Sequence, residues 1–242
     1  MQSKRDKETM ERKSRRRKVR KRKSFFQTLV VLGVMVLILT VFAGVGFSVG
    51  VLQALPDLDG SGLDQYAITT SIYDKDGELV AKLHGAENRI PVSLEEMSPH
   101  LINAVLAIED QRFYSHFGID PIRIVGAMVA NLKEGRIVQG GSTITQQLVG
   151  LCKLDRNEKT FKRKIQEAVL AIKAEREYSK DEILEFYLNR AYFGYSAYGV
   201  EAAAQTYYDK HAKDLNIQES ALLAGIIQNP YSIPLSVIWT QP

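Results

Sequence analysis

The pattern of hydrophobic and polar positions divides the chain into an apolar N-terminal segment and a longer mixed body. From Ser24 to Pro56 the chain has 33 consecutive residues without a charged side chain, and Leu29–Val49 within this run is nearly all apolar. About 20 apolar residues, at ~1.5 Å each, span the ~30 Å hydrocarbon core of a bilayer. We therefore predict a membrane-spanning signal anchor over residues 24–54.

The pattern after residue 55 predicts a short linker and then a mostly α-helical domain over residues 67–242. Residues 55–66 are rich in turn formers and are predicted to be the linker. Alternation within Ile68–Lys82, with Asp76-Gly77 at the turn, predicts a β-hairpin. Apolar periodicity, with Ser98, Thr160 and Ser179 as N-caps, predicts helices over residues 100–114, 121–132, 143–151, 161–178, 182–189, 198–208 and 217–228.

Charge is distributed unevenly along the 242 residues. Residues 1–23 hold 13 Lys and Arg against three Asp and Glu, whereas the rest of the chain holds 19 basic and 25 acidic residues. A basic tail is also typical of a nucleic-acid-binding arm, but its position next to an apolar segment favours anionic lipid headgroups, and we predict no nucleic-acid partner. The positive-inside rule then places residues 1–23 in the cytoplasm and the domain outside.

A cleaved signal peptide is the alternative interpretation of the apolar run. The hydrophobic region of such a peptide has only ~7–15 residues, which is shorter than the run found here, although small residues at Ala43–Gly46 would allow cleavage. The single cysteine, Cys152, excludes an internal disulfide framework and a Cys-rich zinc site. We therefore favour a single-pass membrane protein.

Glu109 is the first residue whose surroundings suggest chemistry. It follows LINAVLAI (101–108), which is apolar on all sides and is therefore predicted to be a buried helix. A carboxylate that is desolvated at the end of such a helix has a raised pKa, which suits a general base near neutral pH. The alternative is a surface glutamate at the point where the helix emerges, with Asp110 beside it.

Gly140–Gln147 (GGSTITQQ) is a second candidate site. Two glycines allow a ligand to approach the backbone, and the helix that follows presents free N–H groups, which favour phosphate. An ordinary glycine turn with a cap would explain the first half of this stretch, but it would not explain the polar groups that gather over the next two turns. These are Ser142, Thr143, Thr145, Gln146 and Gln147.

A group of cations in Lys159–Glu167 (KTFKRKIQE) is a third candidate site. Lys159, Arg163 and Lys164 lie near the start of a predicted helix, where the helix dipole disfavours positive charge. An Arg163–Glu167 pair stabilises a helix by only ~0.2–0.5 kcal/mol. A solvated, salt-bridged face is the alternative, but an anionic ligand accounts better for the position of the cations.

Five stretches, taken in order, resemble the motifs of the peptidoglycan glycosyltransferases (glycosyltransferase family 51), the polymerase module of class A penicillin-binding proteins and of monofunctional glycosyltransferases. The resemblance covers about Ile72 to Pro230. Five matches in the expected order, behind a predicted anchor, are highly specific. The stretches are IEDQRFYSHFGID (108–120), GGSTITQQLV (140–149), RKIQE (163–167), KDEILEFYLNRAYFG (180–194) and SALLAGIIQNP (220–230).

The resemblance implies a mostly helical, lysozyme-like fold with two lobes, a globular lobe and a smaller membrane-facing jaw, after one transmembrane helix. It also implies that the protein polymerises lipid II into β-1,4-linked glycan strands, with inversion at C1 and release of undecaprenyl diphosphate. Glu109 stands at the position of the family's general base. Glu167 stands at its second carboxylate, which could orient the cations or hold a divalent metal, Mg²⁺ or Mn²⁺.

The residue chemistry and the resemblance together predict the site and its partners. Glu109 and Glu167 are the predicted catalytic residues, and Glu167 is the predicted metal ligand. The expected partners are lipid II, the growing glycan strand, the lipid bilayer and other cell-wall synthesis proteins, in a bacterial cell membrane. Substrate binding is predicted for Asp110, Phe113, His116, Arg123, Ser142, Thr143, Thr145, Gln146, Gln147, Lys159, Arg163, Lys164 and Asn189.

Three positions depart from the family pattern. Gly150 and Gly126 stand where the family usually has a Lys and an Arg, and Lys159 replaces a common Arg. Lys153 and Arg123 each lie one helical turn away and could supply the missing charge. Gly126 and Gly150 keep open a module that binds lipid II or divisome partners without turnover. A lysozyme-like lytic enzyme is a second alternative, because a lone acidic Glu suits that reaction too. No Ser-x-x-Lys, Ser-x-Asn or Lys-Thr-Gly motif occurs, so we expect no transpeptidase domain in these residues.

Overall fold

The computed structural model describes residues 67–83, 85–154, 158 and 160–230, together with scattered positions from 32 to 65. The predicted tail, residues 1–23, and much of the predicted anchor, residues 24–54, lie outside the described residues. All described positions between 32 and 53 are helical, but no helix of the described part is long and apolar enough to cross a membrane. The chain divides into two compact units, Met1–Ala54 and Leu55–Pro242, and the second carries the fold.

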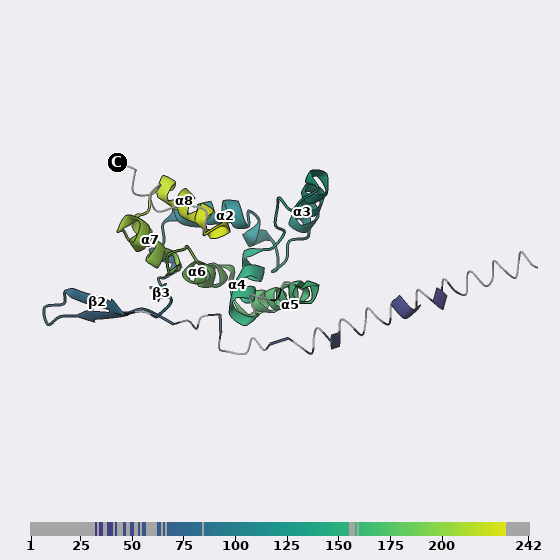
Figure 1. Cartoon of the computed structure of the whole chain (residues 1–242), viewed down its shortest axis with the longest axis horizontal. Coiled ribbons are helices and arrows are strands. Elements are labelled where there is room, and N and C mark those ends of the chain that lie inside the picture. Colours follow the sequence, from purple (N-terminus) through teal and green to yellow (C-terminus); the bar gives the residue numbers. More distant parts are fainter. Residues whose placement is uncertain are drawn as a thin grey trace, which may run out of the picture. The chain divides into compact units, whose positions relative to one another are not determined.

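Two small sheets belong to the second unit. Strand β1 (Thr70–Tyr73) pairs antiparallel with β2 (Leu79–Leu83), and Gly77 takes a φ of 85° in the turn between them. The hairpin predicted over residues 68–82 is therefore confirmed, and Figure 1 shows that it extends away from the helices. Strand β3 (Asn88–Arg89) runs parallel to β4 (Ala197–Tyr198) and joins the start of the domain to its second half.

Helices form most of the body, as predicted (Figure 1). Each predicted helix is present, and Ser98, Thr160 and Ser179 cap theirs through side chains that accept backbone N–H bonds. The α-helices are α2 (Pro99–Glu109), α3 (Pro121–Glu134), α4 (Ile144–Lys153), α5 (Phe161–Glu177), α6 (Lys180–Arg190), α7 (Val200–Tyr208) and α8 (Ile217–Gln228). Short 3₁₀ helices are η1 (Leu94–Glu96), η2 (Phe113–Ser115) and η3 (Ala212–Asp214).

Helix α2 differs from its prediction in two ways. It was expected to run to Tyr114, but it ends at Glu109, because Asp110 leaves the helical conformation (φ −161°, ψ 78°) and turns its carboxylate inward to the N–H of Ile144. It was also expected to be buried on all sides. Only the face with Leu101, Val105 and Glu109 is buried, and the opposite face is open to solvent.

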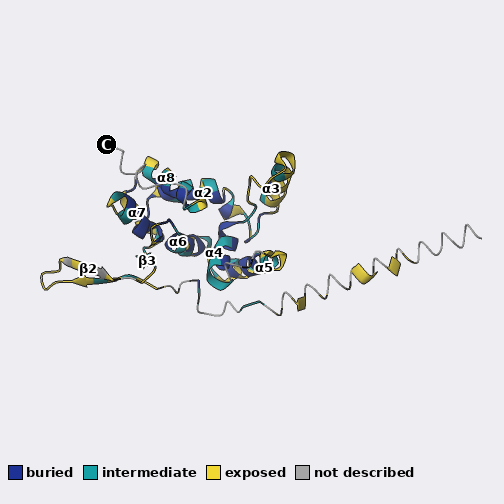
Figure 2. Ribbon diagram, in the orientation of Figure 1, coloured by how far each residue is buried: buried dark blue, intermediate teal, exposed yellow. Residues whose placement is uncertain are grey.

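The core lies between two groups of packed helices. α2 packs against α8, and α4 packs against both α5 and α6. Figure 2 shows buried residues concentrated where these helices meet, whereas α3 is mostly exposed. Only Ala127 of α3 is buried, and the apolar side chains of Ile122, Ile124, Val125, Met128, Val129 and Leu132 are exposed. Helix α3 therefore owes little of its position to the core.

Part of the predicted linker, residues 55–66, is attached to the domain. Leu63 is only 2% exposed and belongs to the hydrophobic core. One guanidinium nitrogen of Arg190, at the end of α6, donates to the carbonyl oxygens of Gly62, Leu63 and Gln65. The described linker residues 62, 63 and 65 therefore pack as part of the domain and do not form a free connection.

Gly118 is a point where three segments meet and where only glycine fits. Its φ is +96°, and a Cβ there would lie 2.7 Å from the backbone carbonyl of Ala171 in α5. Its N–H donates to His116 Nδ1, and its carbonyl accepts from Thr143 Oγ1. Both the conformation and the contact therefore exclude a side chain.

Replacing Gly118 should destabilise the domain. Gly118→Ala should cost about 2 kcal/mol or more, through the left-handed backbone and the clash, which lowers the melting temperature by roughly 4–8 °C. Gly126→Ala in α3 is a matched control, since nothing lies within 4 Å of a Cβ there; it should add about 0.5–1 kcal/mol. Thermal unfolding followed by circular dichroism measures both, and equal melting temperatures would contradict this account of Gly118.

Candidate active site

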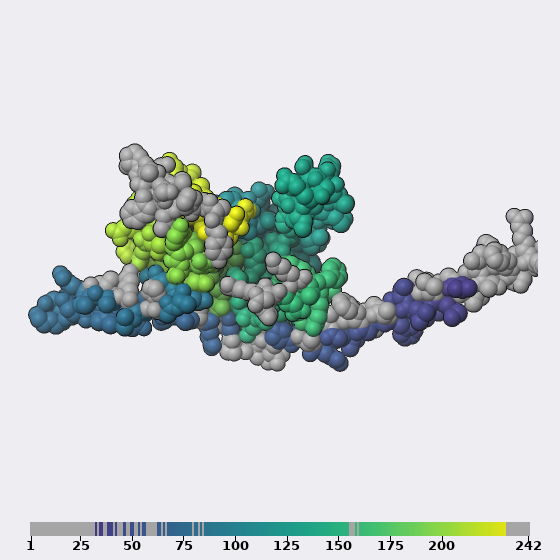
Figure 3. All heavy atoms as spheres, viewed as in Figure 1, coloured from purple at the N-terminus to yellow at the C-terminus, as the bar shows by residue number. Residues whose placement is uncertain are grey.

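A cleft of about 920 Å³ opens between the end of α2, the start of α3, the segment before α4 and the end of α8. In Figure 3 the molecule is hollowed between the teal atoms of α3 and the yellow atoms of α8. The lining is mixed. Its polar side chains are Glu109, Gln111, Arg112, Asp120, Arg123, Gln139, Ser142, Gln147 and Gln228, and its apolar ones include Ile108, Ile122, Val138 and Ile227.

Glu109 is the buried carboxylate of this cleft. As the last residue of α2 it lines the cleft, although the residue is only 7% exposed. Its Oε2 accepts a hydrogen bond of 2.7 Å from Nε2 of Gln147, and Oε1 of that amide accepts one of 3.0 Å from the hydroxyl of Tyr187. The carboxylate is therefore held on one side by α4 and α6 and is open to the cleft on the other.

Asp110 and His116 lie behind Glu109 and connect elements of the domain. Asp110 is fully buried, and its Oδ2 accepts from the N–H of Ile144 at 3.0 Å and lies 2.8 Å from His116 Nε2. Because Gly118 N–H donates to His116 Nδ1, the ring proton of a neutral His116 is on Nε2 and faces the carboxylate. Neither side chain lines the cleft.

The polar residues of the second candidate site divide into two groups. Ser142 and Gln147 line the cleft. Thr143, Thr145 and Gln146 are buried and hold helix α4: Thr143 caps it and donates to Gly118 O at 2.6 Å, Thr145 donates to Glu175 at 2.6 Å, and Gln146 completes a capping box. The clustering that suggested a ligand therefore arises partly from the packing of the helix start.

The cations of the third candidate site surround Glu167. Arg163 Nε lies 3.0 Å from Glu167 Oε1, and Lys164 Nζ pairs with Oε2. Lys164 also donates to Ser142 Oγ at 3.3 Å, so its exposed ammonium reaches the wall of the cleft. Lys159 lies outside the described residues. The group of Arg163, Lys164 and Glu167 has one net positive charge beside the cleft.

Glu167 does not fit a metal-ligand role in this arrangement. Both of its carboxylate oxygens are already engaged by cations. Among the described residues, no group of three His, Cys, Asp or Glu is placed to hold a metal ion. The prediction of Mg²⁺ or Mn²⁺ therefore stays a prediction that rests on the family resemblance.

Two other predicted binding residues are buried in supporting positions. Phe113 is 1% exposed, and the ammonium of Lys180 lies 4.5 Å from the centre of its ring. Asn189 is fully buried, and its amide donates to Val92 O at 2.8 Å and accepts from Val92 N at 3.0 Å. Neither residue lines the cleft.

The positions that depart from the family pattern have distinct surroundings. A Cβ on Gly150 would lie 3.2 Å from Glu167 Oε1, so this glycine packs directly against the third candidate site. The ammonium of Lys153 lies against Gly62, away from the cleft lining. Arg123 does line the cleft, and its buried Nε has no hydrogen-bond partner among the described residues. Of the two cations that could supply the missing charge, the structure places Arg123 in the cleft.

Three site residues were not identified from the sequence. Arg112 and Asp120 form an ion pair on the cleft wall, and Tyr187 supports Gln147 from behind. Arg112 and Asp120 entered the sequence analysis only as part of the stretch 108–120, and a Tyr within an amphipathic helix gives no local signal. Burial, with the charges of Glu109 and Asp110 adding to it, raises the pKa of Tyr187 well above its ordinary value, so this phenol stays protonated.

Together, these contacts place a buried carboxylate at a large cleft, with Arg112 and Arg123 in its lining and Lys164 at its edge. The sequence profile of the family named Transglycosylase matches residues 76–237, and the chain belongs to this family. The predicted family is thus confirmed, and with it the class of peptidoglycan glycosyltransferases.

The curated relatives agree with this assignment. Penicillin-binding protein 1A of Aquifex aeolicus (strain VF5) is 46% identical over 204 residues, which are 83% of this chain and 28% of the relative. Penicillin-binding protein 1A/1B of Bacillus subtilis (strain 168) is 46% identical over 218 residues, 88% of this chain and 23% of the relative. Penicillin-binding protein 1A of Vibrio cholerae is 45% identical over 206 residues, which are 85% of this chain and 25% of the relative. The chain thus spans about a quarter of the length of these relatives.

The Arg112–Asp120 pair makes the cleft wall sensitive to acid. Burial by itself would raise the pKa of Asp120, but the hydrogen bonds from Arg112 and from the N–H of Arg123 outweigh it and lower the pKa below its usual range. A carboxylate of this kind stabilises the fold at pH values above the usual Asp pKa of ~3.9, and that contribution is lost as the pH falls through the folded-state pKa.

Asp120→Asn should therefore lower the melting temperature in a pH-dependent way. At pH 7 we expect a decrease of roughly 2–4 °C, corresponding to about 1 kcal/mol for a pair whose Arg112 is partly exposed to solvent. The difference from the parent should shrink as the pH falls below the usual Asp pKa of ~3.9 and through the lowered pKa of Asp120, where that side chain becomes protonated. Thermal unfolding of both proteins across this range measures it, and a difference that does not change with pH would contradict the assignment.

Proposed function

We propose that this module polymerises lipid II into β-1,4-linked glycan strands with release of undecaprenyl diphosphate. The observation that carries the proposal is Glu109: a carboxylate buried at the end of a helix, lining a cleft large enough for sugars, with its second oxygen held by an amide. The family membership of residues 76–237 supports the same reaction.

The geometry suits proton removal by Glu109. In the proposed reaction the 4-hydroxyl of the acceptor sugar gives its proton to Glu109 as its oxygen attacks C1 of the donor. The bond between C1 and the diphosphate oxygen breaks, the electron pair leaves with the diphosphate, and the configuration at C1 inverts. A base placed within hydrogen-bond reach of such a hydroxyl contributes ~10²–10⁴-fold to the rate.

The cations on the cleft wall suit the leaving group. Negative charge develops on the diphosphate as the bond breaks, and positive groups fixed nearby stabilise that charge. Lys164 donates to Ser142 on the cleft wall, and Arg163 pairs with Glu167, the same carboxylate that pairs with Lys164. Arg123 lines the cleft from the start of α3. These three residues are the proposed diphosphate contacts.

The lipid part of the substrate calls for contact with a bilayer. The exposed apolar face of α3 beside the cleft supports such contact, since contiguous apolar surface of this kind is typical of a membrane or partner interface. We propose that α3 belongs to the membrane-facing jaw of a two-lobed fold, and that a single-pass anchor holds the domain outside a bacterial cell membrane. Other cell-wall synthesis proteins are proposed partners.

The two alternative functions have different products. A lytic enzyme would shorten an existing glycan, and a binding module without turnover would leave lipid II unchanged. Incubation of the detergent-solubilised protein with labelled lipid II and a divalent metal, followed by separation of the products by size, distinguishes polymer, shortened glycan and unchanged substrate. Polymer is the expected product, and either other outcome overturns the proposal.

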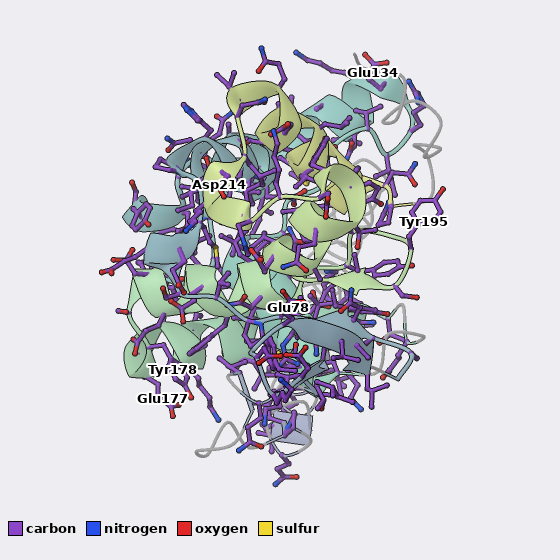
Figure 4. All side chains as sticks on the ribbon, turned by 90° about the vertical axis from the view of Figure 1, so that its left-hand side faces the viewer. Glu78, Glu134, Glu177, Tyr178, Tyr195 and Asp214 are labelled. Carbon is purple, nitrogen blue, oxygen red and sulfur yellow. The ribbon has the colours of Figure 1, made fainter. Side chains whose placement is uncertain are left out.

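Glu109→Gln should abolish polymerisation without unfolding the protein. The amide cannot accept the acceptor's proton, so the rate should fall by ~10²–10⁴-fold. Glu177→Gln is a matched control, because it removes a carboxylate from the end of a different helix, α5. Figure 4 shows Glu177 on the opposite side of the view from Glu134, the last residue of α3. Lipid II turnover measures both, and activity of Glu109→Gln within threefold of the parent would place the base elsewhere.

Arg123→Ala and Lys153→Ala should have unequal effects. Arg123 lines the cleft, whereas Lys153 lies against Gly62. Loss of one charge-assisted contact to phosphate costs ~1.5–3 kcal/mol, so Arg123→Ala should raise the lipid II concentration needed for half-maximal rate by about tenfold or more. Lys153→Ala should stay within about threefold of the parent. Steady-state kinetics test this, and the reverse order would show that Lys153 supplies the missing charge.

A further inference from the structure

Three residues from three helices form a hydrogen-bonded chain that ends at the proposed base. Tyr187 of α6 donates to Gln147 Oε1 at 3.0 Å, and Gln147 Nε2 of α4 donates to Glu109 Oε2 of α2 at 2.7 Å. Oε1 of Glu109 has no hydrogen-bond partner among the described residues. One carboxylate oxygen is therefore held, and the other is available to a ligand in the cleft.

The direction of this chain depends on which way the amide of Gln147 faces. A glutamine side chain has a donor end and an acceptor end of nearly the same shape, and rotation about its terminal torsion exchanges them. The donor end attracts the Glu109 carboxylate. The acceptor end would place a carbonyl oxygen against it and repel it.

Tyr187 supplies the hydroxyl that holds the amide in the orientation favoured by Glu109. Its side chain is only 1% exposed and does not line the cleft, so it cannot touch a substrate there. Its raised pKa keeps the hydroxyl protonated in the presence of Glu109 and Asp110. The carboxylate of Glu109 only accepts, so it turns Nε2 of the amide toward itself and leaves Oε1 facing Tyr187. The hydroxyl then donates its single proton to Oε1 and holds the amide in that orientation.

We propose that Tyr187 is a positioning residue for glycosyl transfer, which acts by locking the Gln147 amide so that its N–H holds one oxygen of Glu109 and leaves the other for the acceptor's hydroxyl. The inference rests on the proposed function, because it assigns a role within that reaction. It also changes the role proposed for Gln147: its amide binds the base, Glu109, instead of the substrate. The three helices are thereby aligned by the same chain of contacts that aligns the base.

A double-mutant cycle tests the lock, using the full chain in detergent micelles with lipid II. Tyr187→Phe should lower kcat by about tenfold, the upper end of what one hydrogen bond contributes, with KM for lipid II unchanged within about twofold. Gln147→Leu should lower kcat at least as much. Because Tyr187 acts only through Gln147, adding Tyr187→Phe to Gln147→Leu should cost nothing further in kcat.

Tyr207→Phe is the matched control for loss of a buried phenol. Tyr207 is 4% exposed and its hydroxyl donates to Phe193 O, and Tyr207 does not line the cleft. It should lower the melting temperature about as much as Tyr187→Phe does, with kcat unchanged. Gln147→Leu removes the hydrogen bond to Glu109 directly and leaves Tyr187 in place. The test therefore does not depend on the folding of Tyr187→Phe alone.

Each outcome decides for or against the lock. An unchanged kcat in Tyr187→Phe, a further loss of kcat in the double variant, or an equal loss of kcat in Tyr207→Phe would overturn it while leaving the proposed function intact, provided that the parent makes polymer. A parent protein that makes no polymer would instead overturn the proposed function, and the inference with it. The lock is supported if Tyr187→Phe and Gln147→Leu each lower kcat, if the double variant has the same kcat as Gln147→Leu alone, and if Tyr207→Phe leaves kcat unchanged.

Discussion

The arrangement of the cleft depends on one buried carboxylate, that of Asp110. A charge that is removed from water must be compensated by hydrogen bonds, and Asp110 obtains two at Oδ2, from the N–H of Ile144 and from His116, while its buried Oδ1 has no partner among the described residues. To reach these partners the chain leaves the helical conformation directly after Glu109. The same turn places Glu109 at the cleft and directs the start of α4 toward it, so that Ser142 and Gln147 arrive beside the base.

Much of the fold could be predicted because its signals are local. Periodicity, N-caps such as Ser98 and Ser179, and the Asp-Gly turn of the hairpin depend on residues a few positions apart. The end of α2 could not be predicted, because its cause, a hydrogen bond between Asp110 and Ile144, joins residues 34 positions apart. The burial of Leu63 in what was predicted to be a linker has the same origin, since Arg190 on a distant helix holds that segment.

The candidate site shows the same division between local and distant causes. Glu109, Ser142, Arg163 and Lys164 were predicted from residue type and family position. The structure places Glu109 and Ser142 in the cleft lining, Lys164 on Ser142, and Arg163 beside Lys164 on the carboxylate of Glu167. Motif positions alone do not separate a side chain that meets the ligand from one that supports it, however. Thr143, Thr145 and Asn189 belong to the motifs, yet their buried side chains hydrogen-bond to other parts of the protein. Phe113 is likewise buried, and its ring contacts the ammonium of Lys180.

Helix α3 has a consequence for the behaviour of the protein in aqueous buffer. Its apolar side chains form an exposed row from Ile122 to Leu132, and Ile137 continues it in the segment that follows. Exposed apolar surface of this size promotes self-association in water unless something covers it. Deleting the apolar N-terminal run would therefore not by itself yield a monodisperse soluble protein. Amphiphile in the buffer, or polar substitutions along α3, would still be needed to keep the molecules apart.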